Sequence, residues 1–312
     1  MPPPIIALLG PTATGKSALA VRLALHLTGQ GRPAEIVNAD SMLVYRGMDI
    51  GTAKPTPHER CGIPHHLVDI LDIQETATVA DFQRLAREAI ASCQQRGVVP
   101  IVVGGSALYL RAILDEFSFP GTDPTLRAEL EAELEELGPL AMYARLASLA
   151  PEAAAEMQPM NGRRVVRALE VVALTGSYKA TLPEHRYALP DVVQIGLEID
   201  RAVMDARIDA RVDDMWAKGL VSEVAALAEH GLRAGVTASR ALGYRQVLAY
   251  LDGLCTEEQA RTDTAAGTRR FARRQLGWWR RDPRIAWFDA LDLPTTGALI
   301  ADSDARSHGD AT

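Results

Sequence analysis

The sequence predicts an α/β fold in which a parallel sheet is flanked by helices and interrupted by an inserted all-helical subdomain. Three observations support this prediction. Short strand-like runs at residues 5–9, 35–39, 98–103 and 192–199 alternate with longer segments of helical periodicity. The run at 5–9 is apolar throughout, as expected for a strand buried on both faces of a parallel sheet. Between about residues 120 and 188, Ala, Leu, Glu and Arg recur at helical spacing instead.

Changes in composition predict the domain boundaries. We expect residues 1–119 to form the first part of the α/β core, 120–188 the helical insertion and 189–295 the second part of the core. Residues 296–312 are small and polar, which predicts a disordered tail. Residues 42–74 form a long stretch rich in Gly, Pro and Thr that we expect to be irregular. Further helices are expected at 18–27, 78–96, 201–218, 221–230, 239–251 and 256–281, and a last short strand at 285–288.

Composition limits the classes of protein to consider. The 312 residues are 47% hydrophobic and carry a net charge of −7, which argues against a uniformly basic nucleic-acid-binding coat. No apolar run is long enough to span a membrane, and no secretory signal is evident at the N-terminus. The three cysteines lack metal or redox spacing, so we expect free thiols in a reducing cytoplasm. A monomer is expected.

A phosphate-binding loop follows the first predicted strand. The octapeptide Gly10-Pro11-Thr12-Ala13-Thr14-Gly15-Lys16-Ser17 lies between that strand and a predicted helix, which is the context such a loop requires. Its glycines allow backbone N–H groups to point at an anion, and the start of the helix adds the positive end of its dipole. Lys16 is suited to phosphate oxygens and Ser17 to Mg²⁺. The fold is therefore expected to be P-loop NTPase-like, with a ligand that carries phosphate or diphosphate.

Two more polar segments are expected at the same edge of the sheet. Asp40 follows the second predicted strand, and Gly104-Gly105-Ser106 follows the next clear strand. In an open parallel sheet the carboxyl ends of the strands form the ligand-binding edge. Asp40 is therefore a candidate general base or Mg²⁺ partner, with a turn cap as the alternative role. The strand at 98–103 ends in glycines rather than an acid, which weakens a motor or GTPase interpretation but leaves a small kinase open.

A basic segment lies near the C-terminus. Residues 268–281 contain six arginines and no acid, and Arg269 and Arg273 share a helix face. Such a stripe suits a nucleic-acid backbone, although a solvated helix that pairs with the acidic insertion is the alternative. Trp278 and Trp279 are expected to pack against the core rather than to stack on bases. The pair His65-His66 has no third ligand at metal spacing, so no metal site is predicted there.

Longer motifs give the sequence a specific resemblance. It is similar to the bacterial tRNA dimethylallyltransferase family in the phosphate loop and in the segments 38–41, 45–55, 64–69, 103–109, 167–171, 243–246 and 273–275, so that the resemblance covers roughly residues 5 to 290. Within these segments, Asp-Ile-Gly-Thr-Ala-Lys-Pro at 49–55 is much more specific than the phosphate loop. Ser106 stands where the family usually has Thr, a mild departure because either hydroxyl can bind a diphosphate oxygen.

The resemblance implies an activity and a set of catalytic residues. The family transfers a dimethylallyl group from dimethylallyl diphosphate to N6 of the adenosine just 3′ of the anticodon. It implies that the phosphate loop binds the diphosphate with Mg²⁺, that Asp40 is the base, and that Ser106 and Arg211 contact the diphosphate. Other possibilities remain open: an ATP-dependent small-molecule kinase that uses the same loop, or a non-catalytic RNA-binding module.

The resemblance also implies a tRNA-binding surface. The helical insertion and the C-terminal helices are expected to clamp the anticodon stem-loop. Several of these positions, including Arg127 and the arginines at 163–167, have no distinguishing feature apart from the resemblance. The residues expected to contact tRNA are Asp40, Ser41, Met42, Leu43, Arg127, Arg163, Arg164, Arg167, Arg240, Gly243, Tyr244, Arg245, Arg273, Arg274 and Gln275.

Overall fold

A computed structural model describes residues 2–76, 78–117, 119–178, 184–295 and 297–299 of the chain. These residues form two compact units. One unit contains residues 1–115 and 187–312, and the other contains residues 116–186. Among the described residues, no helix is both long enough and apolar enough to cross a membrane.

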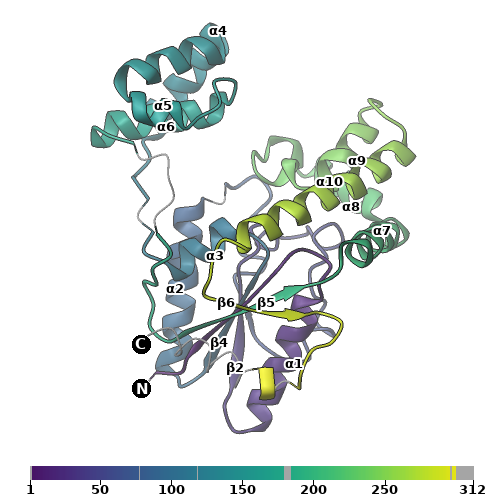
Figure 1. Ribbon diagram of the computed structural model, residues 1–312. Helices are drawn as coiled ribbons and strands as arrows, with labels where there is room; N and C mark the ends of the chain where they lie inside the picture. Colours follow the sequence, from purple (N-terminus) through teal and green to yellow (C-terminus); the bar gives the residue numbers. More distant parts are fainter. Residues whose placement is uncertain (1, 77, 118, 179–183, 296, 300–312) are drawn as a thin grey trace. The chain divides into compact units, whose positions relative to one another are not determined.

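The first unit is built on one parallel sheet of six strands (Figure 1). The strand order is β3-β2-β4-β1-β5-β6, and each pair of neighbours is parallel. This confirms the predicted α/β class with a parallel sheet. The carboxyl ends of the central strands therefore lie along one edge. The strands are β1 (Ile5–Leu9), β2 (Ala34–Asn38), β3 (His65–His66), β4 (Val99–Gly104), β5 (Val192–Glu198) and β6 (Ile285–Asp289).

Helices cover both faces of this sheet, which explains why the central strand β1 is apolar throughout. Ile5, Ala7 and Leu9 of β1 face a core shared with α2 and α3, whereas Ile6 and Leu8 face α1. A strand that is buried on both sides leaves no position for a solvent-facing polar residue. Figure 1 shows α1 on one side of the sheet and α2 with α3 on the other. The helices are α1 (Lys16–Gly29), α2 (Val79–Gln95) and α3 (Ala107–Leu114).

Residues 42–74 are mostly turns and contain the two-residue edge strand β3. This strand has no signal in the sequence pattern, because it is only two residues long. A buried ammonium group holds the segment together: Lys54 Nζ donates to the carboxylates of Asp49 and Asp69 at 2.7 and 2.5 Å, and to the carbonyl of Tyr45 at 2.8 Å. Only 4% of the Lys54 side chain is exposed. The three hydrogen bonds of this buried cation therefore hold together parts of a segment that has little regular secondary structure.

A second charged group anchors this segment to the C-terminal helices. The carboxylate of Glu223 accepts the backbone N–H groups of Asp49, Ile50 and Gly51 at 2.7–3.2 Å, and the hydroxyl of Tyr244 at 2.5 Å. A Cβ on Gly51 would lie only 2.5 Å from the Tyr244 ring. The specific motif at residues 49–55 thus connects the long loop to the helices that contain Glu223 and Tyr244.

The C-terminal part of the first unit is helical, with one boundary that differs from the prediction. A helix was expected from residue 239, but a 3₁₀ turn at Ala238–Arg240 comes first and α9 begins at Tyr244. Gly243, with φ of 89°, separates the two, because this left-handed conformation interrupts a helix and suits glycine. The helices of this part are α7 (Arg201–Ala217), α8 (Leu220–Glu229), α9 (Tyr244–Leu251) and α10 (Glu257–Trp279), and a further 3₁₀ turn covers Leu232–Ala234.

The two adjacent tryptophans at the end of α10 have different environments. Trp279 is fully buried in the core, as expected, whereas Trp278 is 45% exposed, so the packing role predicted for it is wrong. Helical periodicity turns neighbouring residues about 100° apart, so both cannot face the core. The predicted disordered tail lies mostly outside the described residues, but Leu299 within it is buried against the α1 side of the sheet.

The described residues of the second unit contain helices and no strand. It contains α4 (Pro124–Leu149), α5 (Pro151–Ala155) and α6 (Gly162–Thr175). Its separate core includes Leu130, Met142, Leu146, Val165 and Leu169. The long helix α4 is interrupted at Gly138, whose φ of 78° is left-handed and which precedes Pro139.

A buried carboxylate ties the start of α4 to α6. Glu170 has no exposed surface and accepts from Arg127, from Arg167 Nη1 at 2.6 Å and from the Thr122 hydroxyl at 2.6 Å. Burial opposes ionisation, but the hydrogen bonds from the two arginines and the threonine lower the pKa of Glu170 to about 2. Both arginines were expected to contact tRNA. That expectation stays a prediction, and each already has a structural role in the free protein.

We predict that Glu170→Gln loosens the helical unit. Glutamine is neutral, so the two guanidinium groups lose their counter-ion, at a cost of about 2–3 kcal/mol in the stability of this unit. The pKa of Glu170 in the folded protein is below the ordinary value of 4.5. The difference in stability between wild type and variant should therefore be largest above pH 4.5, and it should disappear as the pH falls towards about 2. Hydrogen exchange of α4 and α6 amides measures it. Glu131→Gln, on the exposed side of Arg127, is the matched control, and an equal loss in both variants would refute the role of Glu170.

Candidate active site

The loop between β1 and α1 has the conformation expected of a phosphate-binding loop. Gly10, Ala13 and Gly15 have φ of 141°, 66° and 85°. At Gly10 there is no room for a side chain either, because a Cβ would lie 2.4 Å from the carbonyl oxygen of Leu197 in β5. The first turn of α1 contains no acidic residue, so its dipole is available to an anion.

The side chain of Lys16 folds back onto this loop. Its Nζ donates to the carbonyl of Pro11 at 2.6 Å. The residue is partly exposed, but its ammonium is surrounded by protein. This burial and the nearby Arg211 guanidinium lower the pKa of Lys16 to about 7, against a smaller opposing effect of Asp40. An anion bound beside Lys16 would offset the repulsion from Arg211 and favour the charged form.

Asp40 lies at the carboxyl end of β2 and is positioned by its neighbours. Its N–H donates to Asn38 Oδ1 at 2.8 Å, and Asn38 Nδ2 donates to the carbonyls of Asp40 and Leu67 at 2.8 and 2.9 Å. Asp40 Oδ1 accepts the Met42 N–H at 2.9 Å, so the proposed turn-capping contact exists. Within the described part of the chain, Oδ2 has no hydrogen-bond partner. One carboxylate oxygen thus fixes the turn while the other is available for chemistry.

Arg211 reaches the loop from α7. Its Nη1 lies 3.4 Å from the Thr12 hydroxyl and its Nη2 lies 3.5 Å from the carbonyl of Thr52. Burial lowers the pKa of Arg211, which the Asp40 carboxylate partly offsets, but guanidinium remains charged at neutral pH. Together with Lys16 it places two cationic groups beside the phosphate loop.

These groups share one pocket of about 620 Å³, a size typical of small-molecule sites. Its lining includes the polar side chains of Lys16, Ser17, Asp40 and Arg211 together with a set of apolar side chains. The pocket therefore suits a molecule that carries both an anionic group and an apolar group. The apolar set includes Ala20, Val21, Leu25, Ile36, Leu43, Val68, Val103 and Phe271.

The structure adds Gln275 of α10 to this pocket. Its Oε1 accepts the Thr12 N–H at 3.0 Å and its Nε2 donates to the Gly105 carbonyl at 2.8 Å. A Cβ on Gly105 would lie 2.4 Å from that Nε2. Gln275 therefore bridges the loops that follow β1 and β4. It was expected at a tRNA-binding surface, but it is buried. The helical spacing of Ala272, Gln275 and Trp279 could have revealed the buried face.

The other predicted site residues are distributed as follows. Ser106 begins α3 next to Gly105 but does not line the pocket. Burial raises the pKa of Tyr109, and the nearby Ser41 side chain partly offsets this rise. Tyr244 is fully buried and Gly243 is buried beside it, whereas Arg240 and Arg245 are exposed. The binding roles of these residues stay predictions.

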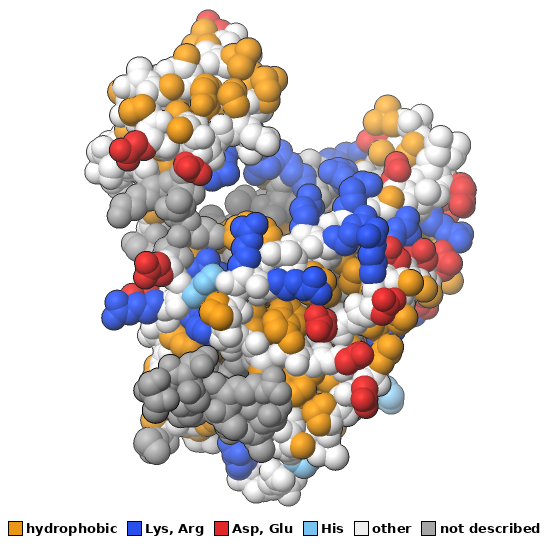
Figure 2. Space-filling model, viewed as in Figure 1, with side chains coloured by type: hydrophobic (Ala, Val, Ile, Leu, Met, Phe, Trp, Pro, Cys, Tyr) orange, Lys and Arg blue, Asp and Glu red, His pale blue; other side chains and the backbone are white. Residues whose placement is uncertain are grey.

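The basic side chains of α10 form an exposed surface. Figure 2 shows Lys and Arg side chains gathered over this helix. Arg270 and Arg274 are exposed, and Arg269 and Arg273 are half-buried. Arg269 pairs with Asp209 of α7, and Arg273 lies 3.6 Å from Asp205. The acids that pair with Arg269 and Arg273 thus come from α7.

Comparison with known proteins places this pocket in context. Residues 43–282 match the family described as IPP transferase. A protein of Thermobifida fusca named tRNA dimethylallyltransferase is 61% identical over 292 residues, which are 93% of this chain and 91% of that protein.

Solved structures are also similar. The full-length tRNA isopentenylpyrophosphate transferase of Bacillus halodurans is 40% identical, with a TM-score of 0.69 over 96% of this chain and 94% of that one. A eukaryotic dimethylallyltransferase described as acting on tRNA is 28% identical, with a TM-score of 0.80 over 96% of this chain and 77% of that one.

We predict that Gln275→Ala weakens the binding of inorganic diphosphate about tenfold. The substitution removes both hydrogen bonds that hold the phosphate loop against the loop after β4, each worth about 1 kcal/mol. Titration calorimetry measures the affinity. Gln83→Ala is the control, because it also removes a side-chain bond to a backbone carbonyl, that of Ala112 at 2.7 Å, but far from the pocket. Equal diphosphate affinity in the two variants would contradict the bridging role.

Proposed function

The chain belongs to the IPP transferase family, and from this premise we propose that it transfers a dimethylallyl group from dimethylallyl diphosphate to N6 of an adenosine in tRNA. The proposed target is the adenosine just 3′ of the anticodon. The observation that carries the proposal is the single pocket in which Lys16, Arg211 and Asp40 meet beside apolar side chains. This combination matches a donor with a charged diphosphate and a small hydrocarbon tail.

The reaction follows from these groups. The adenine N6 lone pair attacks C1 of the dimethylallyl group, the C1–O bond breaks, and diphosphate leaves with the bond's electron pair. Lys16 and Arg211 stabilise the charge that develops on the leaving diphosphate. Asp40 accepts the N6 proton, which makes a poorly nucleophilic amine reactive. The adenine must leave its stack to reach the pocket, as in other enzymes that modify bases.

Mg²⁺ is part of the proposal. The Ser17 hydroxyl lines the pocket beside Lys16. Mg²⁺ typically uses one or two protein oxygens together with phosphate oxygens and water, so this hydroxyl fits it and leaves Asp40 free to accept the proton. When bound, Mg²⁺ would neutralise part of the diphosphate charge.

The tRNA-binding surface is proposed on the basis of charge. The exposed arginines of α10 lie on the same helix as Gln275 and Phe271, which line the pocket. Arginine contacts to phosphates orient a nucleic acid without reading its sequence. We propose that this surface and the helical unit bind the anticodon stem-loop. A monomeric state and a cytoplasmic location remain predictions from the sequence.

The two alternative functions are less well supported. A small-molecule kinase would use the same phosphate loop, but the family and the relatives described above are prenyl transferases that modify tRNA. A non-catalytic RNA-binding module would have no use for Lys16 and Asp40 together in one pocket.

We predict that Lys16 takes up a proton when the donor binds. With a pKa of about 7 it is largely neutral at about pH 8, and the diphosphate raises that pKa again. Donor binding at this pH should therefore take up close to one proton, and the uptake should vanish well below pH 7, where Lys16 is already charged. Calorimetry in buffers of different ionisation enthalpy measures it. The uptake should be absent in Lys16→Met and unchanged in Arg22→Met, which also alters a pocket residue; equal uptake in all three proteins would contradict the assignment.

The decisive test is transfer of labelled dimethylallyl groups to unmodified tRNA in the presence of Mg²⁺. Wild-type protein should label the tRNA, and Asp40→Asn should reduce turnover by about 100-fold or more, because the amide cannot accept the proton. Donor affinity should change little. Asp292→Asn, at an exposed position, should behave as wild type. Absence of labelling together with phosphate transfer from ATP to a small molecule would overturn the proposal.

A further inference from the structure

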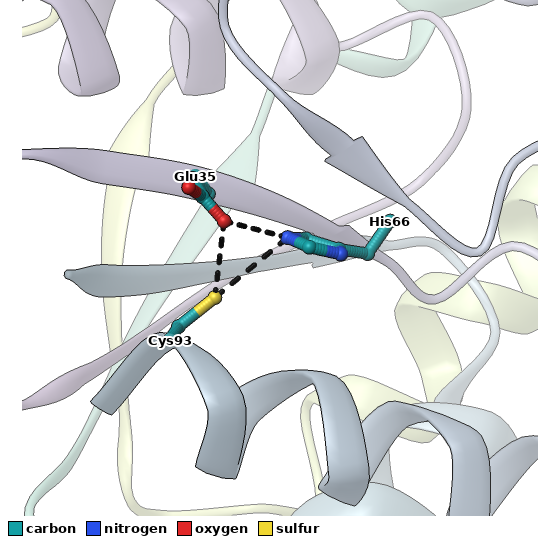
Figure 3. A group of neighbouring side chains, drawn as sticks. All are labelled: Glu35, His66 and Cys93. Carbon is teal, nitrogen blue, oxygen red and sulfur yellow. Dashed lines mark hydrogen bonds and ion pairs between the residues drawn. The ribbon is translucent and has the colours of Figure 1, made fainter. Parts of the chain in front are cut away.

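A second group of reactive side chains lies at the edge of the sheet, outside the pocket. Glu35 of β2, His66 of β3 and Cys93 near the end of α2 point toward one another (Figure 3). His66 Nε2 lies 2.7 Å from Glu35 Oε2, and Cys93 Sγ lies 3.4 Å from that oxygen and 3.7 Å from that nitrogen. The adjacent His65 lines the donor pocket, whereas His66 does not.

These three atoms are spaced almost as they would be around one tetrahedral metal ion. Ordinary zinc bond lengths place a nitrogen and an oxygen ligand about 3.3 Å apart, and sulfur about 3.5 Å from either. The two distances to sulfur already agree within about 0.2 Å. The third must open by roughly 0.6 Å, as expected when a metal replaces the hydrogen bond between His66 and Glu35. We propose that Glu35, His66 and Cys93 form a binding site for a thiophilic divalent cation of the zinc class, with water as the fourth ligand.

A cationic side chain already occupies this position. Arg96 donates to Glu35 Oε1 and Oε2 at 2.7 and 2.6 Å, and its Nη2 lies 3.5 Å from Cys93 Sγ. The cluster therefore attracts positive charge at the two atoms that a metal would bind. The Arg96 side chain is 47% exposed, so it can turn into solvent when an ion enters. On binding, Cys93 releases its thiol proton to solvent and binds the metal as the thiolate. Arg96 gives up its contacts with Glu35 and Cys93.

The site would have a structural effect. It joins β2, the edge strand β3 and α2, and β3 pairs with β2 through only His65 and His66. Beyond β3, the carbonyl of Leu67 accepts from Asn38, which positions Asp40. A metal ion bound by Glu35 and His66 would therefore fix β3 against β2, the strand that leads to Asp40. This inference concerns residues outside the pocket and does not depend on the proposed reaction.

Cobalt is a direct probe because its coordination by thiolate can be seen spectroscopically. The full-length protein is freed of metal with a chelator and titrated with Co²⁺. A sulfur-to-cobalt charge-transfer band should appear and be abolished by Zn²⁺. Cys93→Ser and His66→Gln should each weaken binding about 100-fold, while Cys61→Ser, which alters an exposed cysteine away from the cluster, should bind as wild type. Circular dichroism verifies that each variant is folded.

Arg96→Gln separates a metal site from a purely structural ion-pair cluster. If Arg96 competes with the metal, its removal should tighten Co²⁺ binding about tenfold. Zn²⁺ should then restore the thermal stability that the variant loses in chelator. The proposal is overturned if no charge-transfer band forms in the wild type, if the band survives in Cys93→Ser, or if Arg96→Gln binds Co²⁺ no more tightly than the wild type.

Discussion

The arrangement of the site depends on the parallel pairing of β1 with β4 and β5 at the centre of the sheet. This register sets Leu9 beside Gly104 on one side and Gly196 on the other. The phosphate loop and the loop after β4 therefore leave the sheet at the same level. The contact requires close approach of backbone at both ends: Gly10 lies against Leu197, and Gly104 lies against the Ala39 carbonyl, where a Cβ would be only 2.6 Å away. Glycine at these positions is what allows the binding edge to close.

In the segment 42–74, hydrogen bonds with two charged side chains hold the backbone in place, in addition to its turns. The segment 42–74 has few ladder or helix hydrogen bonds of its own, and its backbone is held instead by Lys54 from within and by Glu223 from α8. Buried charges of this kind are tolerated only when they are fully paired. The segment contributes Thr52, Ala53 and Pro55 to the pocket. The pocket therefore keeps its shape only if Lys54 and Glu223 hold this segment in place.

The arginines of the protein include two kinds: some pair with a buried carboxylate, and others face solvent. Arg127 and Arg167 bind a buried carboxylate in the helical unit, whereas Arg270 and Arg274 are exposed on α10. Gln275, one position after Arg274, faces inward and joins two loops of the pocket. A single helix thus carries both the basic surface proposed for tRNA and a contact with the loops of the pocket proposed for the donor.

The sequence by itself determined most of the strands and helices and their order along the chain, because buried strands leave short apolar runs and helices leave a 3.6-residue period; the edge strand β3 was the exception. It also determined the phosphate loop and the position of Asp40 after β2, since both are local patterns whose place follows from the direction of a parallel strand. Tertiary structure alone decided which distant polar groups meet. The pairing of Lys54 with Asp69, the bridge made by Gln275, the burial of Glu170 and the meeting of His66 with Glu35 and Cys93 all join residues from different elements. Side-chain partners across such distances leave no periodic trace in the chain, so they become visible only when the fold brings them together.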